Sequence, residues 1–334
     1  MELITGAKKC SPPTRNEDYN YDALVPRARS YSVLAISMIA LIAAHAEGRV
    51  GALANPVLIY LNHVYVVPDL DTYEAVAENH FLLDNFGASE SRTTVRGDKT
   101  YTGIYFYGEH TYFELLEPPK SAETHESLSG VAFGVEKPGE IKGLAATLKK
   151  SGPSKIHLDS ITRQTEGVDL SWFTMLSTEP ELQKSKLSTW VMEYDSDFLS
   201  TWYPQFPPHG PNIRRSDILE RYAAKINRSE QRERGLFQDI VRIHLALENS
   251  EVEEFRRRCE IYGYQTFKNG RETACKGPNI ELEIQGFDGN RPPTRSGVTA
   301  VEFQLRRNKT DQKIFKLGAN SVLELKDKTA MWRF

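Results

Sequence analysis

Two polar residues, His63 and Glu114, stand at the centres of apolar, β-branched and aromatic segments. Such segments are typical of β-strands, in which alternate side chains share one face of the sheet. His63 would then share a face with Leu61 and Tyr65, and Glu114 would share one with Tyr112. Burying an imidazole and a carboxylate on these faces costs free energy unless each group has a partner. A divalent cation would be such a partner, and it could polarise a carbonyl group or activate a water molecule.

The same two residues allow other interpretations. His63 and Glu114 could hydrogen-bond to each other or to neighbouring tyrosines, either in a metal-free ligand pocket or in a purely structural arrangement. The residue types and their spacing do not choose between these three possibilities.

The strands that carry His63 and Glu114 belong to a βαβββ unit that recurs along the chain. The first copy is predicted to have strands at 57–67, 91–96, 100–107 and 111–116, with a helix near 69–83. The second is predicted to have strands at 130–136, 155–161, 168–176 and 187–194, with a helix at 138–150. Repeated supersecondary units of this size imply paired modules that share a sheet core, in the α+β class.

A weaker pair of copies follows a Pro-rich linker at 203–212 and a charged segment at 216–234, which predicts a surface helix joining the halves. The third copy is predicted at 240–285, and a shortened fourth has strands at 298–305, 313–317, 322–325 and 330–334. We therefore expect a leader at 1–46, a module pair at 47–202, a linker and connecting helix at 203–235, and a second, degenerate pair at 236–334.

The leader contains an apolar run at 31–46, preceded by two arginines and ending in Ala44-His45-Ala46. A basic region, a short apolar region and a small-x-small end predict a secretory signal, with cleavage before Glu47 and an extracytoplasmic protein. The polar stretch before the arginines is long for a signal. A short membrane anchor or a buried core helix are the alternatives, although the run is shorter than the ~20 residues of a membrane span.

Composition narrows the class of protein. The chain has 334 residues, 40% of them hydrophobic and 26% charged, which excludes a disordered chain and suggests about two domains. A formal net charge of −3 argues against nucleic acid as a partner. The sequence has no GxGxxG, Walker A, GxSxG or HExxH motif. In an exported protein, Cys259 and Cys275 could form a disulfide, or they could be two buried free thiols.

The arrangement resembles the vicinal oxygen chelate superfamily, the glyoxalase and extradiol-dioxygenase group, and more specifically a family of glyoxalase-like proteins. The segments that carry the resemblance are Tyr60-Leu-Asn-His-Val-Tyr-Val-Val, Arg92-Thr-Thr-Val-Arg, Thr100-Tyr-Thr-Gly-Ile-Tyr-Phe-Tyr-Gly, Thr111-Tyr-Phe-Glu-Leu-Leu-Glu-Pro and Gly130-Val-Ala-Phe-Gly-Val. They lie in residues 56–200, and the match is weaker from 236 to 334. The resemblance implies that each module pair forms a half-barrel around one site.

In that superfamily, metal ligands come from the first and fourth strands of each module. The matching positions in the first pair are His63, Glu114, Val131 and Glu193, and three of these residues can bind a metal. The resemblance therefore implies a divalent ion, Fe, Mn or Zn, held by His63, Glu114 and Glu193. In the second pair, His244 and Glu281 or Glu283 match without further ligands, which predicts a structural half.

The expected function is that of a glyoxalase-like, metal-dependent isomerase, lyase or oxygenase acting on a small oxygenated molecule. Glu193 would take part in catalysis, and His157, on a predicted strand, could reach the pocket as a general base. The alternative is a protein of the same fold that binds or sequesters a small molecule without turnover.

Overall fold

Two curled sheets make up the fold in the computed structural model, which describes residues 57–96, 99–119, 128–152, 155–165, 167–178, 187–202, 212–291 and 293–334. The first sheet has eight strands in the order β2-β3-β4-β1-β5-β8-β7-β6, and the second has six in the order β10-β11-β12-β9-β13-β14. Both sheets belong to one compact unit, Ala54–Phe334. The predicted leader lies outside the described residues, as does most of the predicted linker.

The first sheet consists of two complete βαβββ modules. The first module contains β1 (Tyr60–Val66), α1 (Leu70–Ala77), a short π-helical turn η1 (Leu82–Phe86), β2 (Ala88–Arg96), β3 (Lys99–Tyr107) and β4 (Tyr112–Leu116). The second contains β5 (Ser129–Gly134), α2 (Glu140–Ser151), β6 (Ile156–Thr165), β7 (Val168–Thr178) and β8 (Leu187–Tyr194). In each module the first and fourth strands pair in parallel, and β1 and β5 join the modules antiparallel. The predicted α+β class with paired βαβββ modules is confirmed.

The second sheet is a shortened version of the first. In the described part of the connection between the halves lie the helices α3 (Ser196–Trp202), α4 (Arg215–Lys225) and α5 (Ser229–Arg234). The third module contains β9 (Phe237–Glu248), α6 (Asn249–Ile261), β10 (Gln265–Asn269), β11 (Glu272–Lys276) and β12 (Glu281–Phe287). The fourth copy is reduced to β13 (Gly297–Leu317) and β14 (Ser321–Arg333). The prediction of four short strands here was wrong. Residues 305–313 continue β13, which forms a long hairpin with β14, and the pairing register of the two strands shifts at the irregular positions.

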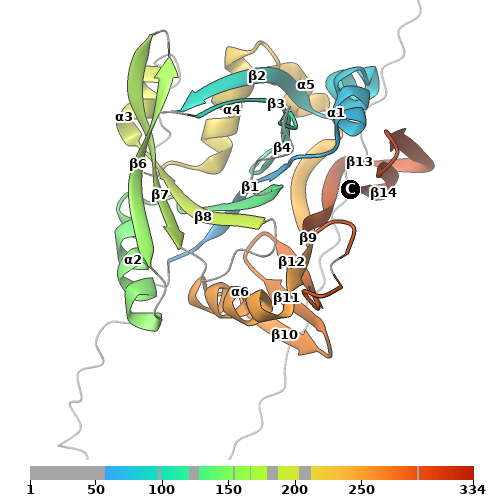
Figure 1. The fold of residues 1–334 in the computed structure, drawn as a ribbon. Helices are drawn as coiled ribbons and strands as arrows, with labels where there is room; N and C mark the ends of the chain where they lie inside the picture. Colours follow the sequence, from blue (N-terminus) through green and yellow to red (C-terminus); the bar gives the residue numbers. More distant parts are fainter. Residues whose placement is uncertain are drawn as a thin grey trace, which may run out of the picture. The chain divides into compact units, whose positions relative to one another are not determined.

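The outer faces of both sheets close on one shared apolar core (Figure 1). Val64, Phe113 and Val131 of the first sheet belong to the same buried cluster as Ile243 and Phe303 of the second. Hydrogen bonds join the two halves as well: the Leu61 amide donates to Asn279 Oδ1 over 3.0 Å, and the Val298 amide donates to Ser129 Oγ over 2.9 Å. Since the outer faces are used in this way, only the inner faces are left for a site.

A β-bulge at Asn62 changes which way the residues of β1 point. Leu61 pairs with Phe133 and His63 pairs with Ala132, so Asn62 is an extra residue in the strand. Leu61 therefore lies in the shared core, whereas His63 lies on the inner face. The expectation that Leu61 and His63 share a face was wrong for this reason.

Helix α4 fills part of the inner face of the first sheet, contrary to the expected surface helix. Its buried residues Ile218, Leu219 and Tyr222 belong to the same cluster as Tyr107 of β3. Tyr222 stacks on Tyr107 with ring centroids 5.5 Å apart. In Figure 1 the sheet curls around this helix, and its edge strands β2 and β6 are in contact. Within the described chain, no helix is both long and apolar enough to cross a membrane.

The environment of the two described cysteines gives a testable expectation. Cys259 on α6 and Cys275 on β11 are free thiols in the shared core, with exposed fractions of 1% and 0%. Burial raises the pKa of the Cys259 thiol, and contact with Cys275 raises it further. Since the thiolate is the reactive species, iodoacetamide should label neither residue in folded, reduced protein and both in guanidinium chloride, as read by peptide mass spectrometry. Equal labelling of folded and unfolded protein would contradict this packing.

Candidate functional site

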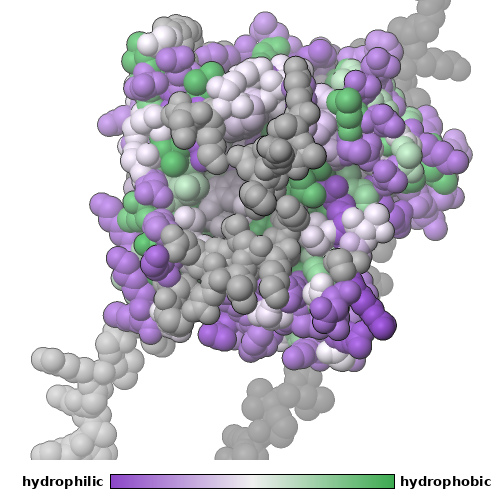
Figure 2. Space-filling model, in the orientation of Figure 1, coloured by the Kyte–Doolittle hydropathy of each residue, from purple (hydrophilic) through white to green (hydrophobic). Residues whose placement is uncertain are grey.

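The inner face of the first sheet, called here the first cup, is lined mainly by aromatic side chains. Its buried cluster contains Tyr105, Tyr107, Tyr112, Trp172, Phe173 and Tyr194, and Trp190 packs against it. These side chains are largely buried, and the surface on this side of the molecule shows hydrophilic and pale residues with scattered hydrophobic ones (Figure 2). Gly130 contributes by lacking a side chain, because a Cβ there would lie 2.2 Å from the ring of Tyr65. Aromatic side chains of this kind can contact flat or apolar parts of a small molecule.

His63 lies in this cup with only 6% of its surface exposed. Its ring stacks on Tyr112 at 4.4 Å between centroids and meets Trp190 edge-on at 5.3 Å. His63 Nδ1 lies 2.9 Å from Asn62 Oδ1, which can only accept, so Nδ1 carries the proton and Nε2 carries the lone pair. Burial lowers the pKa of His63 to about 3, which keeps the ring neutral.

Glu114 on β4 is the other titratable group at this position. Its Oε1 lies 3.9 Å from His63 Nε2, too far for a hydrogen bond, and the residue is 8% exposed. Burial raises the pKa of Glu114 to about 7, while Arg92 and a hydrogen bond from Tyr112 act in the opposite direction. Tyr112 is also hydrogen-bonded to Tyr194. Glu114 can therefore gain or lose a proton near neutral pH, a property typical of catalytic carboxylates.

Arg92 supports the wall of the cup next to Glu114. Its guanidinium lies 4.0 Å above the ring of Tyr105 and donates to Glu90 over 2.6 Å and to Tyr107 Oη over 3.1 Å. Because Glu90 balances its charge, Arg92 lowers the pKa of Glu114 only partly, and burial prevails.

The structure does not bring Glu193 to His63 and Glu114. On β8, Trp190 and Met192 lie on the inner face, so Glu193 points to the outer face, as Val131 does on β5. The carboxylate of Glu193 accepts from the amides of Gly139 over 2.8 Å and Ile141 over 3.0 Å, at the start of α2. Glu193 is therefore a helix cap, which satisfies free amides and complements the helix dipole.

His157 lies at the far end of the first sheet. It pairs with Ser177, which pairs with Trp190, so it is on the inner face, and the strand order puts β6 four strands from β1. The described contacts of His63 and Glu114 do not include His157. Its predicted role as a general base stays a prediction.

A second group of possible metal ligands, Glu109, His110 and Asp239, has ligand atoms within 4.8 Å of one another. Asp239 Oδ1 already accepts from the amides of His110 and Thr111, and Asp239 Oδ2 lies 3.0 Å from His110 Nδ1. Glu109 pairs with Arg306 at 3.1 Å. Since each carboxylate has a partner in the protein, this group ties the turn between β3 and β4 to β9, and the buried pair in the first cup is the stronger candidate.

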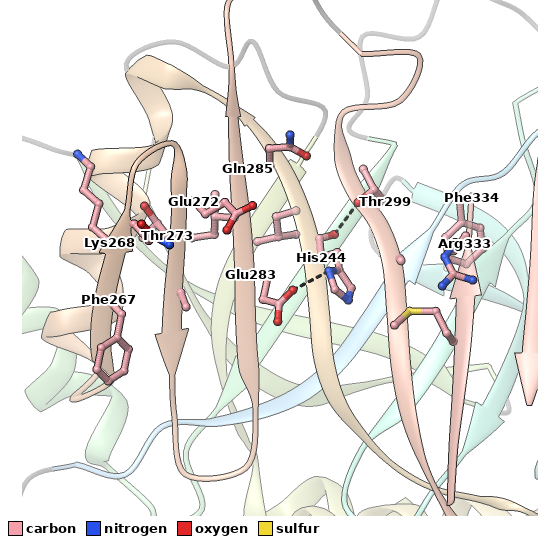
Figure 3. A pocket seen from close by; sticks show the side chains of 16 residues that line it. His244, Phe267, Lys268, Glu272, Thr273, Glu283, Gln285, Thr299, Arg333 and Phe334 are labelled. Carbon is pink, nitrogen blue, oxygen red and sulfur yellow. Dashed lines mark hydrogen bonds and ion pairs between the residues drawn. The ribbon is translucent and has the colours of Figure 1, made fainter. Parts of the chain in front are cut away.

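The inner face of the second sheet, called here the second cup, is an open pocket of about 660 Å³ (Figure 3). His244 lies there beside Glu283, with Nδ1 3.0 Å from Glu283 Oε2, and 28% of the His244 side chain is exposed. The sequence predicted a structural half, but these side chains line a cavity instead of a core.

Sequence reasoning missed the residues that orient His63, namely Asn62, Tyr112, Trp190 and Tyr194. The available signal was an Asn directly before a His within a strand, where regular alternation would put the two side chains on opposite faces. Only a bulge lets such neighbours bond to each other on one face.

A family model described as "Family of unknown function (DUF5829)" matches residues 61–334. The chain belongs to the DUF5829 family. No curated protein matches this DUF5829 chain in sequence. The match covers both sheets.

Solved structures similar to this DUF5829 chain include a hypothetical protein from Staphylococcus aureus, with 12% identity over 80% of this chain and 98% of that one, and a TM-score of 0.51. An extradiol ring-cleaving dioxygenase from B. fuscum has 12% identity over 69% of this chain and 54% of its own, with a TM-score of 0.37. A mutant of 4-hydroxymandelate synthase from Streptomyces coelicolor has 12% identity over 71% and 65%, with a TM-score of 0.35. Likeness at this identity concerns the fold alone.

The raised pKa of Glu114 predicts a pH-dependent effect on stability. A glutamate with a pKa near 4.5 when unfolded and about 7 when folded favours the folded state below pH 4.5, and this contribution is lost as the pH rises through 7. In chelator-treated protein, Glu114→Gln should therefore raise the free energy of unfolding at pH 8 by about 2 kcal/mol and change it little at pH 4.5. Urea unfolding at both pH values measures this, and an equal effect at the two would be inconsistent with a buried, neutral Glu114.

The position of Glu193 predicts a structural effect. Glu193→Ala should lower the free energy of unfolding by about 1 kcal/mol, because two amides of α2 lose their acceptor, and Glu193→Gln should cost less because it keeps one. Urea midpoints of the two variants and the wild type test this. Unchanged stability in Glu193→Ala would show that the carboxylate does not cap the helix.

Proposed function

We propose that this protein is a metal-dependent enzyme for a small oxygenated molecule, with its active site in the first cup. Among the described residues, His63 and Glu114 are the ones that hold the ion. The substrate class, a molecule with two neighbouring oxygens and a flat or apolar part, follows from the few protein ligands and from the aromatic lining of the cup.

One observation carries the proposal: a neutral imidazole and a carboxylate face each other in a buried site without bonding to each other. The distance from His63 Nε2 to Glu114 Oε1 is 3.9 Å. Two atoms that each bind one ion at about 2.1 Å lie about 3–4 Å apart, so the pair fits a shared cation. Asn62 holds Nδ1 of His63, as outer partners of metal-binding histidines do.

The fit is partial, because Glu193 caps α2 and Val131 faces the core. With two ligands from the protein, substrate oxygens and water would complete the coordination, so we expect weak binding of the metal alone. A bound divalent ion would supply Lewis acidity to a carbonyl or hydroxyl group of the substrate.

The protein's own groups have clear roles in this proposal. Trp190 and Tyr112 hold the ring of His63 and form an apolar wall beside it. A Glu114 carboxyl that is not bound to metal can hold or release a proton near neutral pH. Tyr112 and Tyr194 extend from Glu114 as a chain of hydroxyl groups, along which a proton can move.

A second candidate function is a metal-free binding protein. The outward orientation of Glu193 and Val131 favours it, because the second module then places Gly130, Ala132 and Trp190 on the inner face, none of which is a metal ligand. In this case the cup binds its ligand by aromatic contact and by hydrogen bonds to Glu114 and Tyr112.

Calorimetric titration of chelator-treated protein with Mn²⁺ or Zn²⁺ separates the two functions. Wild type should bind about one ion per chain, His63→Ala and Glu114→Ala should abolish binding, and Asn62→Ala should weaken it about tenfold to a hundredfold. Glu193→Ala and His244→Ala are the matched controls and should bind like wild type. Equal affinity in wild type and His63→Ala would refute the proposed site, and absence of binding in wild type would favour the metal-free function.

A further inference from the structure

The second cup contains a row of side chains that crosses five neighbouring strands and is independent of the site proposed above. The paired residues in this row, in strand order from β11 to β14, are Ala274, Glu283, His244, Ala300 and Arg333. The row lines the pocket of about 660 Å³, a volume typical of small-molecule sites. His244 is its central member.

The imidazole of His244 is held in place by an ion pair. Glu283 Oε2 lies 3.0 Å from Nδ1, so this nitrogen already has a partner in the protein. Arg242 fixes Glu283 in turn, with Nε 3.0 Å from Glu283 Oε1, and also binds Glu281 and Glu302. Both oxygens of Glu283 are therefore engaged.

Nε2 of His244 is buried and has no hydrogen-bond partner among the described residues. A buried polar atom without a partner is costly, and here it belongs to a residue that lines a cavity. Ala274 and Ala300 flank Glu283 and His244 in the row, and both line the same pocket with small side chains. A ligand hydroxyl group would supply the missing partner, because a hydroxyl group can both donate and accept.

Positive charge lies at the β14 end of the row. Arg333 is two strands from His244, about 10 Å between backbones, and its side chain is 55% exposed. Figure 3 shows Arg333 and Phe334 at one border of the pocket and Phe267 at the other. Glu324, 3.4 Å from Nη1 of Arg333, occupies one of the five donors of the guanidinium, so others can bind a carboxylate.

We propose that the second cup binds a small hydroxy acid, whose hydroxyl group forms a hydrogen bond with His244 Nε2 and whose carboxylate pairs with Arg333. Met331, which lines the pocket on β14, and the methyl groups of the two alanines suit a short apolar spacer between the two groups. At the opposite end of the pocket, Glu272 of β11 and Lys268 of β10 carry opposite charges, whereas Arg333 at the β14 end is the cation that the proposal assigns to the carboxylate.

The test compares two probes that differ only in the hydroxyl group, 6-hydroxyhexanoate and hexanoate, with dissociation constants measured by ligand-observed NMR. Wild type should bind 6-hydroxyhexanoate about fivefold to tenfold more tightly than hexanoate, the usual effect of one hydrogen bond. His244→Ala should bring this ratio to about one while hexanoate still binds. His244→Phe, which keeps a ring at this position, should also bring the ratio to about one. This variant is the control for a folding defect in His244→Ala.

Two further variants locate the site. Arg333→Gln should weaken both probes by a similar factor and leave their ratio unchanged, because it removes the partner of the shared carboxylate. His63→Ala should change neither constant, which separates this site from the first cup. The proposal is overturned if wild type binds neither probe, if it does not distinguish them, or if the ratio survives in both His244 variants.

Discussion

The shared core between the two sheets is the constraint on which the rest of the structure depends. Strand residues that face this core are apolar and buried, so the chemistry of each strand is confined to the alternate, inner positions. Val131 and Glu193 fall on the outer side, and His63 and Glu114 fall on the inner side. The orientation of the residues along each strand therefore decides which of the four expected ligand positions can meet.

The bulge at Asn62 is a local exception to this alternation, and it determines which residues of β1 lie in the first cup. One extra residue turns the chain so that Leu61 stays in the core while Asn62 and His63 bond to each other within the cup. Burial then acts on the two titratable groups in opposite directions, since it lowers the pKa of His63 and raises that of Glu114. Both groups are thereby biased toward their neutral forms, a state that a cation or a polar ligand between them would change.

Much of the fold followed from the sequence because hydrophobic periodicity and turn residues are local signals. The repeated βαβββ units, with most of their strands and helices, were predicted correctly on this basis. The position of α4 was not, because the charged residues of its segment suggested solvent exposure, while Asp217 and Arg221 are in fact buried, with exposed fractions of 6% and 2%. The length of the β13–β14 hairpin also depends on pairing between distant segments, which no local pattern specifies.

The candidate site was predicted in part. His63 and Glu114 were found because a polar residue within an apolar strand is a strong signal, and the structure brings them together. Glu193 was assigned by position in the resemblance, and an offset of one residue on β8 was enough to turn it toward α2. The orientation of a strand residue depends on register and bulges, and these are properties of the paired strands.

Anomalous diffraction from a crystal of the protein grown with Mn²⁺ would test the central claim most directly, because it locates the ion without reference to activity. The account predicts the strongest anomalous peak between His63 Nε2 and the carboxylate of Glu114, with Glu193 still bound to the amides of α2. A peak beside Glu193, at His244 and Glu283, or among Glu109, His110 and Asp239, with none at His63, would contradict it.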